Sequence, residues 1–177
     1  MKILAVIDMQ NDFVDGALGT AEAQAIVPRV CEKIRGFDGA VLYTRDTHGP
    51  DYLQTQEGRF LPAVHCVKGT HGYALCPGVA ALSAGAPVID KPAFGSRELA
   101  ERLAEMHREE ALESVTFIGL CTDICVISNA LLVKAFLPEV PIIVDASCCA
   151  GVTPESHRRA LECMKVCQIV IENNAAD

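Results

Sequence analysis

The chain has 177 residues, of which half are hydrophobic and 5% aromatic, and it carries a formal net charge of −8. This length fits one domain spanning residues 1–177 with a full hydrophobic core, and the acidic balance argues against a nucleic-acid or anionic-membrane surface. No segment is long enough to cross a membrane, and the apolar run 2–7 is too short for a signal peptide. The nine cysteines favour reduced thiols in the cytoplasm over a disulfide framework.

Short apolar runs alternate with segments whose apolar residues recur at helical spacing. In chain order we expect strand 3–7, helix 21–35, strand 40–44, helix 79–83, strand 87–90, helix 98–110, strand 115–120, helix 124–136, strand 140–144, helix 154–165 and strand 167–171. Residues 45–75 lack a clear period, and a loop of this length in a compact domain is usually functional. Because parallel neighbours need crossover connections, the alternation predicts an α/β three-layer sandwich with a central six-stranded, mostly parallel sheet.

Residues able to do chemistry follow the predicted strands, namely Asp8, Asp46, Lys91, the segment 121–125 and Asp145. In open α/β sheets ligands bind beyond the carboxyl ends of the strands, so we expect these side chains to meet in one crevice. Cys125 is expected in the first turn of a helix, where the helix dipole and free N–H groups favour a thiolate. Taken alone, Cys125 fits better as a small buried hydrophobic residue, the commonest state of a free cysteine.

A thiol, a carboxylate and an ammonium group in one crevice predict acyl transfer through a thioester, followed by hydrolysis. Asp8 is the candidate base that takes the proton of the Cys125 thiol. Lys91 would stabilise the thiolate and the negative charge that develops at the reacting carbonyl group. The backbone N–H groups of Cys121 and Cys125 could form an oxyanion hole at the turn into the helix.

A second group of polar residues predicts a metal site. Asp46 and His48 alternate after a strand and can point the same way, and Glu57 and His65 follow in the long loop. Carboxylates and imidazoles suit one divalent ion such as Zn²⁺, Mn²⁺ or Fe²⁺, although ordinary polar loop residues are the alternative. The other histidines are interpreted as one spare ligand candidate and two solvent-facing helix residues, namely His71, His107 and His157.

Five sequence features occur together and in this order: Ile-Asp8-Met-Gln-Asn-Asp12-Phe13, Thr-Arg-Asp46-Thr-His48, His65-Cys-Val-Lys-Gly-Thr70, Lys91 and Gly119-Leu-Cys-Thr-Asp-Ile-Cys125-Val. This combination closely resembles the isochorismatase-like cysteine hydrolases, and within them it is most similar to the nicotinamidases. The resemblance extends over essentially the whole chain.

The resemblance implies a triad of Asp8 as base, Lys91 and the nucleophile Cys125, together with a cis peptide bond directly before Cys121 that directs this N–H into the oxyanion hole. The implied reaction belongs to NAD metabolism and converts nicotinamide to nicotinate and ammonia. Phe13 is available to stack on a flat substrate, and Phe94 is a candidate second wall of the pocket. Relatives are often dimers or larger assemblies, so a homo-oligomer acting on a small amide is expected.

The resemblance also implies a metal near the triad that binds the pyridine nitrogen of the substrate. Nicotinamidases hold it with an Asp-x-His pair and a later His, and Asp46, His48 and His65 match these positions. Some relatives add a loop His and others a Glu, of which only Glu57 fits in this sequence.

Two departures from the family pattern concern the pocket. Cys121 stands where Ala is usual, and the aromatic residue that often precedes the last metal histidine is missing from the segment 61–65. Relatives that cleave carbamoyl or ureido groups keep the same triad, so another small amide, carbamoyl or ureido hydrolase is the alternative function. A non-catalytic binding member of the fold is a third reading, against which the intact triad argues.

Overall fold

The computed structural model describes residues 1–174, so the last three residues of the expected domain lie outside the described part. Its six strands form one sheet in the order β3-β2-β1-β4-β5-β6, and every neighbouring pair is parallel. The strands are β1 (Lys2–Ile7), β2 (Ala40–Asp46), β3 (Val88–Lys91), β4 (Ser114–Leu120), β5 (Ile142–Ala150) and β6 (Val170–Glu172). The α/β prediction is confirmed, with a sheet that is parallel throughout.

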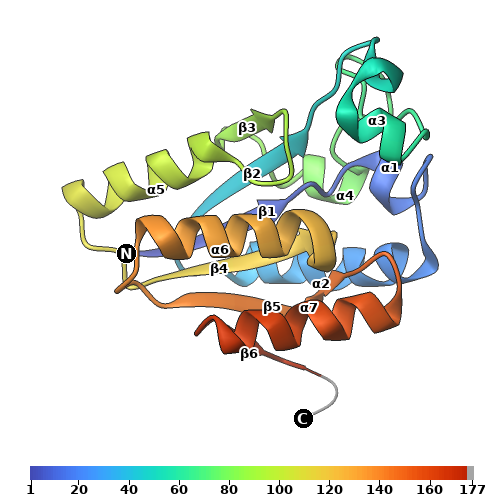
Figure 1. The fold of residues 1–177 in the computed structure, drawn as a ribbon. Helices are drawn as coiled ribbons and strands as arrows, with labels where there is room; N and C mark the ends of the chain where they lie inside the picture. The colour runs from blue at the N-terminus through green and yellow to red at the C-terminus, as the bar shows by residue number, and fades with distance from the viewer. Residues whose placement is uncertain (175–177) are drawn as a thin grey trace.

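Helices cover both faces of the sheet (Figure 1). They are α1 (Asn11–Val14), α2 (Ala21–Gly36), α3 (Gln56–Phe60), α4 (Pro77–Ala80), α5 (Arg97–Glu109), α6 (Ile127–Phe136) and α7 (Pro154–Val166), with a 3₁₀ turn η1 (Tyr52–Gln54) and a π-helical turn η2 (Thr122–Val126). Helices α5, α6 and α7 form one outer layer, and α2 and α4 pack on the opposite face. None of the helices within residues 1–174 combines the length and apolar character needed to span a membrane.

Strand β1 shows why the sheet is central to the core. Ile3, Ala5 and Ile7 point into the cluster formed with α5, α6 and α7, whereas Leu4 and Val6 point into the cluster formed with α2. Successive side chains of a strand alternate between its faces, so a strand covered on both sides needs an unbroken apolar run. The run 3–7 predicted from the sequence is this strand.

Strand β5 differs from its prediction. It does not end at Asp145 but continues to Ala150, after the β4–β5 register shifts between Phe117 and Gly119. Asp145 therefore lies inside the strand, where its Oδ2 pairs with Lys33 Nζ at 2.7 Å. The expectation that Asp145 reaches the crevice is wrong, because the small residues after it keep pairing with β4 across a bulge that the sequence pattern does not reveal.

The segment 45–75, which was expected to be a loop, and the polar segment after β1 both contain short helices. Residues 11–14 form α1, and residues 52–60 form η1 and α3, whose N-cap Thr55 accepts a hydrogen bond from the backbone N–H of Gly58. Strand β4 leads into the π-helical turn η2 before α6 begins at Ile127. Cys125 lies in this π-helical turn, a kind of local irregularity that is frequent at functional sites.

Candidate active site

The site lies where the chain reverses its direction of progress across the sheet. β1, β2 and β3 are laid down outward on one side, and the chain then returns to place β4 on the other side of β1. The carboxyl ends of β1 and β4 therefore flank the topological switch point, the usual place for a ligand in such sheets. Gly119 permits this close approach: its φ is +117°, and a Cβ atom there would lie 2.1 Å from the carbonyl oxygen of Ile7.

Asp8, Lys91 and Cys125 come together at this edge although they lie far apart in sequence. Lys91 Nζ is 2.7 Å from Asp8 Oδ2 and 3.3 Å from Cys125 Sγ, and it also donates to the carbonyl oxygen of Ala93 at 3.1 Å. Thr44 donates its hydroxyl hydrogen to Asp8 Oδ1 at 2.7 Å. The three side chains are buried, so each charge depends on the others rather than on water.

The protonation states follow from this burial. Burial raises the pKa of the Cys125 thiol well above its usual value, and the nearby carboxylate of Asp8 raises it further. Burial and the Asp8 carboxylate thus oppose the effect on the thiol pKa that was expected from the helix start. Burial also raises the pKa of Asp8, against the attraction of Lys91, which makes Asp8 a stronger base than an exposed aspartate.

Asp8 is left with room to accept a proton. Its Oδ2 is buried and accepts no well-aligned hydrogen bond from the described residues, although the ammonium group of Lys91 lies beside it. Burial alone would lower the pKa of Lys91, but Asp8, Cys125 and Asp46 raise it, so this side chain stays cationic. The arrangement can transfer a proton from a thiol to a carboxylate beside a fixed positive charge.

Asp46, His48, Glu57 and His65 form the second cluster. One ligand atom from each lies within 4.8 Å of those of the other three, and they are the only such group of His, Cys, Asp or Glu within residues 1–174. His48 Nε2 is 2.9 Å from Asp46 Oδ2 and 3.6 Å from Glu57 Oε1. Two imidazoles and two carboxylates suit a divalent transition metal, so the donor set fits the expected ion.

The orientation of His65 favours a ligand role. Its Nδ1 lies 2.8 Å from the carbonyl oxygen of Ala63, which can only accept a hydrogen bond, so Nδ1 carries the hydrogen. Nε2 then faces the cluster, where it lies 3.4 Å from Asp46 Oδ2. When Nε2 gives up its hydrogen, its lone pair can bind a metal there, the orientation that backbone carbonyls commonly impose on metal-binding histidines. The buried ring of Tyr52 packs on both histidine rings, with centroid distances of 4.6 Å to His48 and 4.9 Å to His65.

Asp46 belongs to both clusters. Its Oδ1 is 3.3 Å from Lys91 Nζ, while its Oδ2 faces the two histidines. Burial alone would raise the pKa of Asp46, but hydrogen bonds with His48 and His65 lower it below its usual range, so this carboxylate is ionised. One anionic side chain thus connects the expected metal ligands to the ammonium group of the triad.

Two buried amides that were given no role from the sequence hold these clusters in place. Gln10 accepts a hydrogen bond from the backbone N–H of Asp46 at 2.7 Å and donates to its carbonyl oxygen at 2.8 Å. Asn129 donates to the carbonyl oxygens of Cys125 and Phe94 and accepts from the backbone N–H of Ser96. The only sequence signal for them is a polar residue inside an apolar or motif-rich segment.

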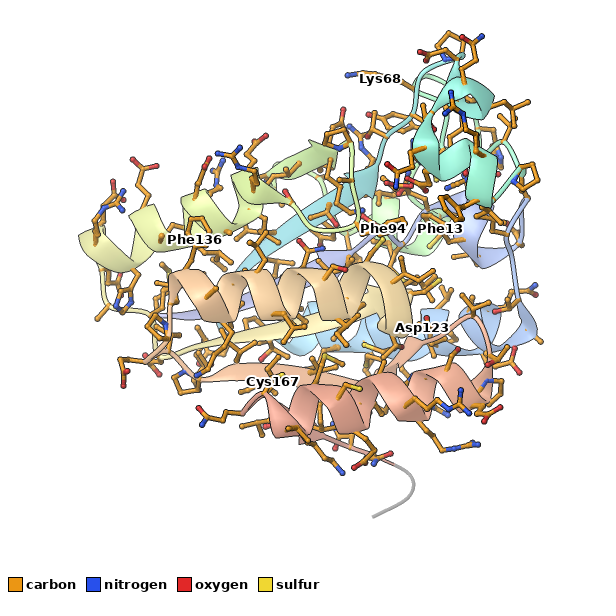
Figure 2. All side chains as sticks on the ribbon, viewed as in Figure 1. Phe13, Lys68, Phe94, Asp123, Phe136 and Cys167 are labelled. Carbon is orange, nitrogen blue, oxygen red and sulfur yellow. The ribbon has the colours of Figure 1, made fainter. Side chains whose placement is uncertain are left out.

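A cavity of about 770 Å³ opens onto both clusters. Cys125 and the four expected metal ligands line it, whereas Asp8 and Lys91 lie behind this surface. Phe13 and Phe94, the two residues expected to contact the substrate, also line it and are labelled in Figure 2. Phe13 is buried, and its ring centroid is 5.5 Å from that of His65.

The remaining expectations have mixed outcomes. The peptide bond between Leu120 and Cys121 is cis, as the resemblance implied, and Cys121 lines the cavity. His71 lies outside the metal cluster found within residues 1–174.

His157 does not face solvent as expected: it is half-buried, its Nδ1 lies 2.8 Å from Thr122 Oγ1, and burial lowers its pKa. His107 is likewise half-buried and accepts a hydrogen bond from the backbone N–H of Leu112.

Comparisons with known proteins agree with this fold. Residues 2–175 match the Isochorismatase domain. The chain is 32% identical to an isochorismatase family protein of Bacillus subtilis (strain 168), over 90% of this chain and 92% of that protein. It is 28% identical to the nicotinamidase/pyrazinamidase of Mycobacterium tuberculosis (strain ATCC 25618 / H37Rv), over 96% and 97% of the two chains.

Among solved structures, the pyrazinamidase of Pyrococcus horikoshii in complex with zinc superposes with a TM-score of 0.80 at 32% identity, covering 96% of this chain and 97% of that one. The expected resemblance, including its direction toward nicotinamidases, is confirmed. The chain belongs to the isochorismatase domain family.

Proposed function

We propose that the protein is a metal-dependent cysteine amidohydrolase that converts nicotinamide to nicotinate and ammonia through a thioester on Cys125. As an isochorismatase family member with nicotinamidase/pyrazinamidase relatives, it is a hydrolase that acts on an amide C–N bond. The observation that carries the finer proposal is the sharing of Asp46, which joins the Asp8–Lys91–Cys125 group to a four-residue metal-ligand set beside one cavity.

Acylation begins with the proton of the Cys125 thiol. Asp8 takes it as the sulfur attacks the amide carbon, and the adjacent ammonium of Lys91 stabilises the developing thiolate. The backbone N–H groups of Cys121 and Cys125 donate hydrogen bonds to the carbonyl oxygen as it becomes negatively charged. Asp8 then gives its proton to the departing nitrogen, which leaves as ammonia, and the acyl group stays on Cys125 as a thioester.

Deacylation repeats these steps with water. Asp8 removes a proton from a water molecule that attacks the thioester carbon, and the same backbone N–H groups hold the oxyanion. Collapse of this intermediate breaks the C–S bond, and the proton held by Asp8 returns to Cys125. Nicotinic acid leaves and releases its proton to water to become nicotinate, and the neutral thiol favoured by burial is restored.

The second cluster binds and orients the substrate in this proposal. A divalent ion held by Asp46, His48, Glu57 and His65 would supply a Lewis-acid position for the pyridine nitrogen of nicotinamide. The ring would then lie against Phe13 with its amide directed at Cys125. The Tyr52 ring packs on the two histidine rings, and Gln10 holds the backbone of Asp46.

The decisive experiment measures ammonia release from nicotinamide by purified protein whose bound Zn, Mn and Fe have been quantified. A carbamoyl and a ureido substrate are run alongside, and Cys125→Ala protein purified in the same way controls for contaminating amidases. We expect nicotinamide turnover with about one metal ion per chain, the stoichiometry of a single site. Turnover of only the carbamoyl or ureido compound would keep the Cys125 chemistry and refute nicotinamide as substrate.

A further inference from the structure

The cavity is larger than nicotinamide requires. At the roughly 30 Å³ that a water molecule occupies in the liquid, the nine non-hydrogen atoms of nicotinamide fill at most about 270 Å³. The cavity measures about 770 Å³ and falls in the upper range of sites for larger organic ligands. A single pyridine ring placed between Cys125 and the metal ligands leaves more than half of this space to something else.

The unfilled part of the cavity has no positive side chain. The four acidic or imidazole residues that line it belong to the metal cluster, and neither lysine nor arginine appears among the residues of the described chain that form its wall. A carboxylate or phosphate on the substrate, away from the reacting amide, would be desolvated there without a partner, which is costly. The space therefore fits an uncharged group.

The mouth of the cavity is apolar and comes from three separate segments. Phe60 and Leu61 lie at the end of α3, Phe94 follows β3, and Val152 follows β5, and all four line the cavity. The Phe60 side chain is 84% exposed, and the other three are also counted among the exposed large hydrophobic residues. Large apolar side chains gathered around one opening mark a ligand-binding surface more often than chance exposure.

Two hydrogen bonds anchor this mouth to the site. The hydroxyl group of Tyr52, whose ring packs on the metal-site histidines, donates to the carbonyl oxygen of Leu61 at 2.9 Å. The backbone N–H of Val152 donates to the carboxylate of Asp123, which lies in the same turn as Cys125. The apolar mouth is thus built onto the catalytic edge, at a fixed position relative to it.

We infer that, besides nicotinamide, the site takes and favours uncharged amides whose apolar body is larger than one six-membered ring, and that Phe60, Leu61, Phe94 and Val152 contact the extension. This inference rests on the proposed amidohydrolase function and extends its substrate class. Removing an added apolar group from water in such a pocket contributes selectivity, whereas the absence of a cation in the wall disfavours amides that carry an acid.

The test compares nicotinamide with quinoline-3-carboxamide, which keeps the ring nitrogen and the amide and adds a fused apolar ring. The metal-loaded protein should show a kcat/KM roughly tenfold or more higher for the bicyclic amide, the selectivity that one well-buried apolar group can give. A nicotinamide that carries a carboxylate at ring position 5 should be a poor substrate. Equal or lower kcat/KM for the bicyclic amide, with nicotinamide turned over, would overturn the inference and leave the amidase intact.

Two variants assign the effect to the mouth. Phe60→Ser should lower kcat/KM for the bicyclic amide more than for nicotinamide, whereas Phe136→Ser, which removes an exposed phenylalanine on α6 outside the cavity (Figure 2), should leave the ratio unchanged. Sedimentation analysis of both variants is needed as well. If Phe60→Ser altered the oligomeric state and left the ratio unchanged, the mouth would be a contact between chains and the inference would be wrong.

A binding measurement separates failure of the inference from failure of the function. If neither amide is hydrolysed, the proposed function fails. Calorimetric titration of metal-loaded Cys125→Ala protein then decides about the pocket: tighter binding of quinoline-3-carboxamide than of nicotinamide supports the apolar extension site, and no preference between them overturns it.

Discussion

Replacing Lys91 by methionine tests how the triad is held together. The Lys91 side chain is buried, its residue 1% exposed, and its Nζ lies 2.7 Å from Asp8 Oδ2 and 3.3 Å from Asp46 Oδ1. Methionine keeps most of the volume and removes the charge. With metal bound, Asp46 keeps a cationic partner, so the carboxylate left uncompensated in the variant is that of Asp8.

The expected loss in the free energy of unfolding follows from the protonation of Asp8. The folded variant avoids an unpaired buried charge by binding a proton on Asp8. One pKa unit corresponds to about 1.36 kcal/mol, so protonating a carboxyl group with an ordinary pKa of about 3.9 costs about 4 kcal/mol at pH 7. This agrees with the roughly 3–5 kcal/mol expected when one partner of a buried ion pair is removed. The same reasoning gives about 1.5 kcal/mol at pH 5.

Proton binding determines how the stability loss of the Lys91→Met variant changes with pH. Folded Lys91→Met protein holds a proton on Asp8 that the unfolded chain lacks above the ordinary carboxyl pKa, so its free energy of unfolding falls, relative to wild type, as the pH rises from 5 to 7. Urea unfolding at both pH values, with metal content checked, measures this. In the Asp8→Asn background the substitution should cost far less and lose its pH dependence, because no carboxylate is stranded.

Lys33→Met provides a matched control, since Lys33 Nζ also lies 2.7 Å from a carboxylate, that of Asp145. Lys33 is partly exposed, and Asp145 keeps a hydrogen bond from the Ser147 hydroxyl group, so a smaller loss is expected. A loss below about 1 kcal/mol for Lys91→Met at pH 7, or an undiminished loss in the Asp8→Asn background, would refute the buried ion pair as the element that holds the triad.

Four further outcomes test the individual roles. Because burial raises the pKa of Asp8, kcat/KM should decline with falling pH through a value above the ordinary pKa of about 3.9; a decline only below that value would exclude Asp8 as the base. Alkylation of Cys125, followed by mass spectrometry of its peptide without substrate, should still be accelerating above about pH 8.5; a plateau near neutrality would indicate a stable thiolate. His48→Ala should lose metal and raise KM more than it changes Cys125 alkylation, and a full metal complement with unchanged kinetics would remove His48 from the site. Gln10→Ala, which releases the backbone of Asp46, should weaken metal affinity by roughly 10- to 100-fold, and an unchanged affinity measured by chelator competition would assign Gln10 to folding alone.

Much of this arrangement was predictable because strand ends are readable in the sequence. A parallel sheet covered on both faces requires unbroken apolar runs, and each run ends where a polar residue can reach solvent or a ligand. Asp8, Asp46 and Lys91 each stand at such an end, so one edge of the sheet had to hold them all. This rule predicts the position of only part of the metal cluster, because His65 and Glu57 come from a segment without periodicity and not from a strand end.

What failed depends on tertiary packing. Asp145 follows an apolar run just as Asp8 does, but a bulge lets β5 continue past it, and pairing with β4 rather than local composition decides where the strand ends. Cys125 was placed correctly near a helix start, but its burial, which the local sequence does not show, raises the thiol pKa. Asn129 acts only through contacts with segments far apart in the chain, which no local pattern encodes.

The link between the two clusters follows from the register of β2 and β3. Asp46 is paired with Lys91 at the last rung, and Arg45 with Asp90 at the rung before it. Successive residues point to opposite faces, so Arg45 and Asp90 form an ion pair of 2.8 Å that is partly exposed, whereas Asp46 and Lys91 are buried beside Asp8. A shift of one residue in either strand would exchange these faces and would bring Arg45 or Asp90 to the buried side. The register of β2 and β3 therefore has two effects. It forms the Arg45–Asp90 ion pair on one face of this sheet edge, and on the other face it places Asp46 where its carboxylate joins the metal ligands to Lys91.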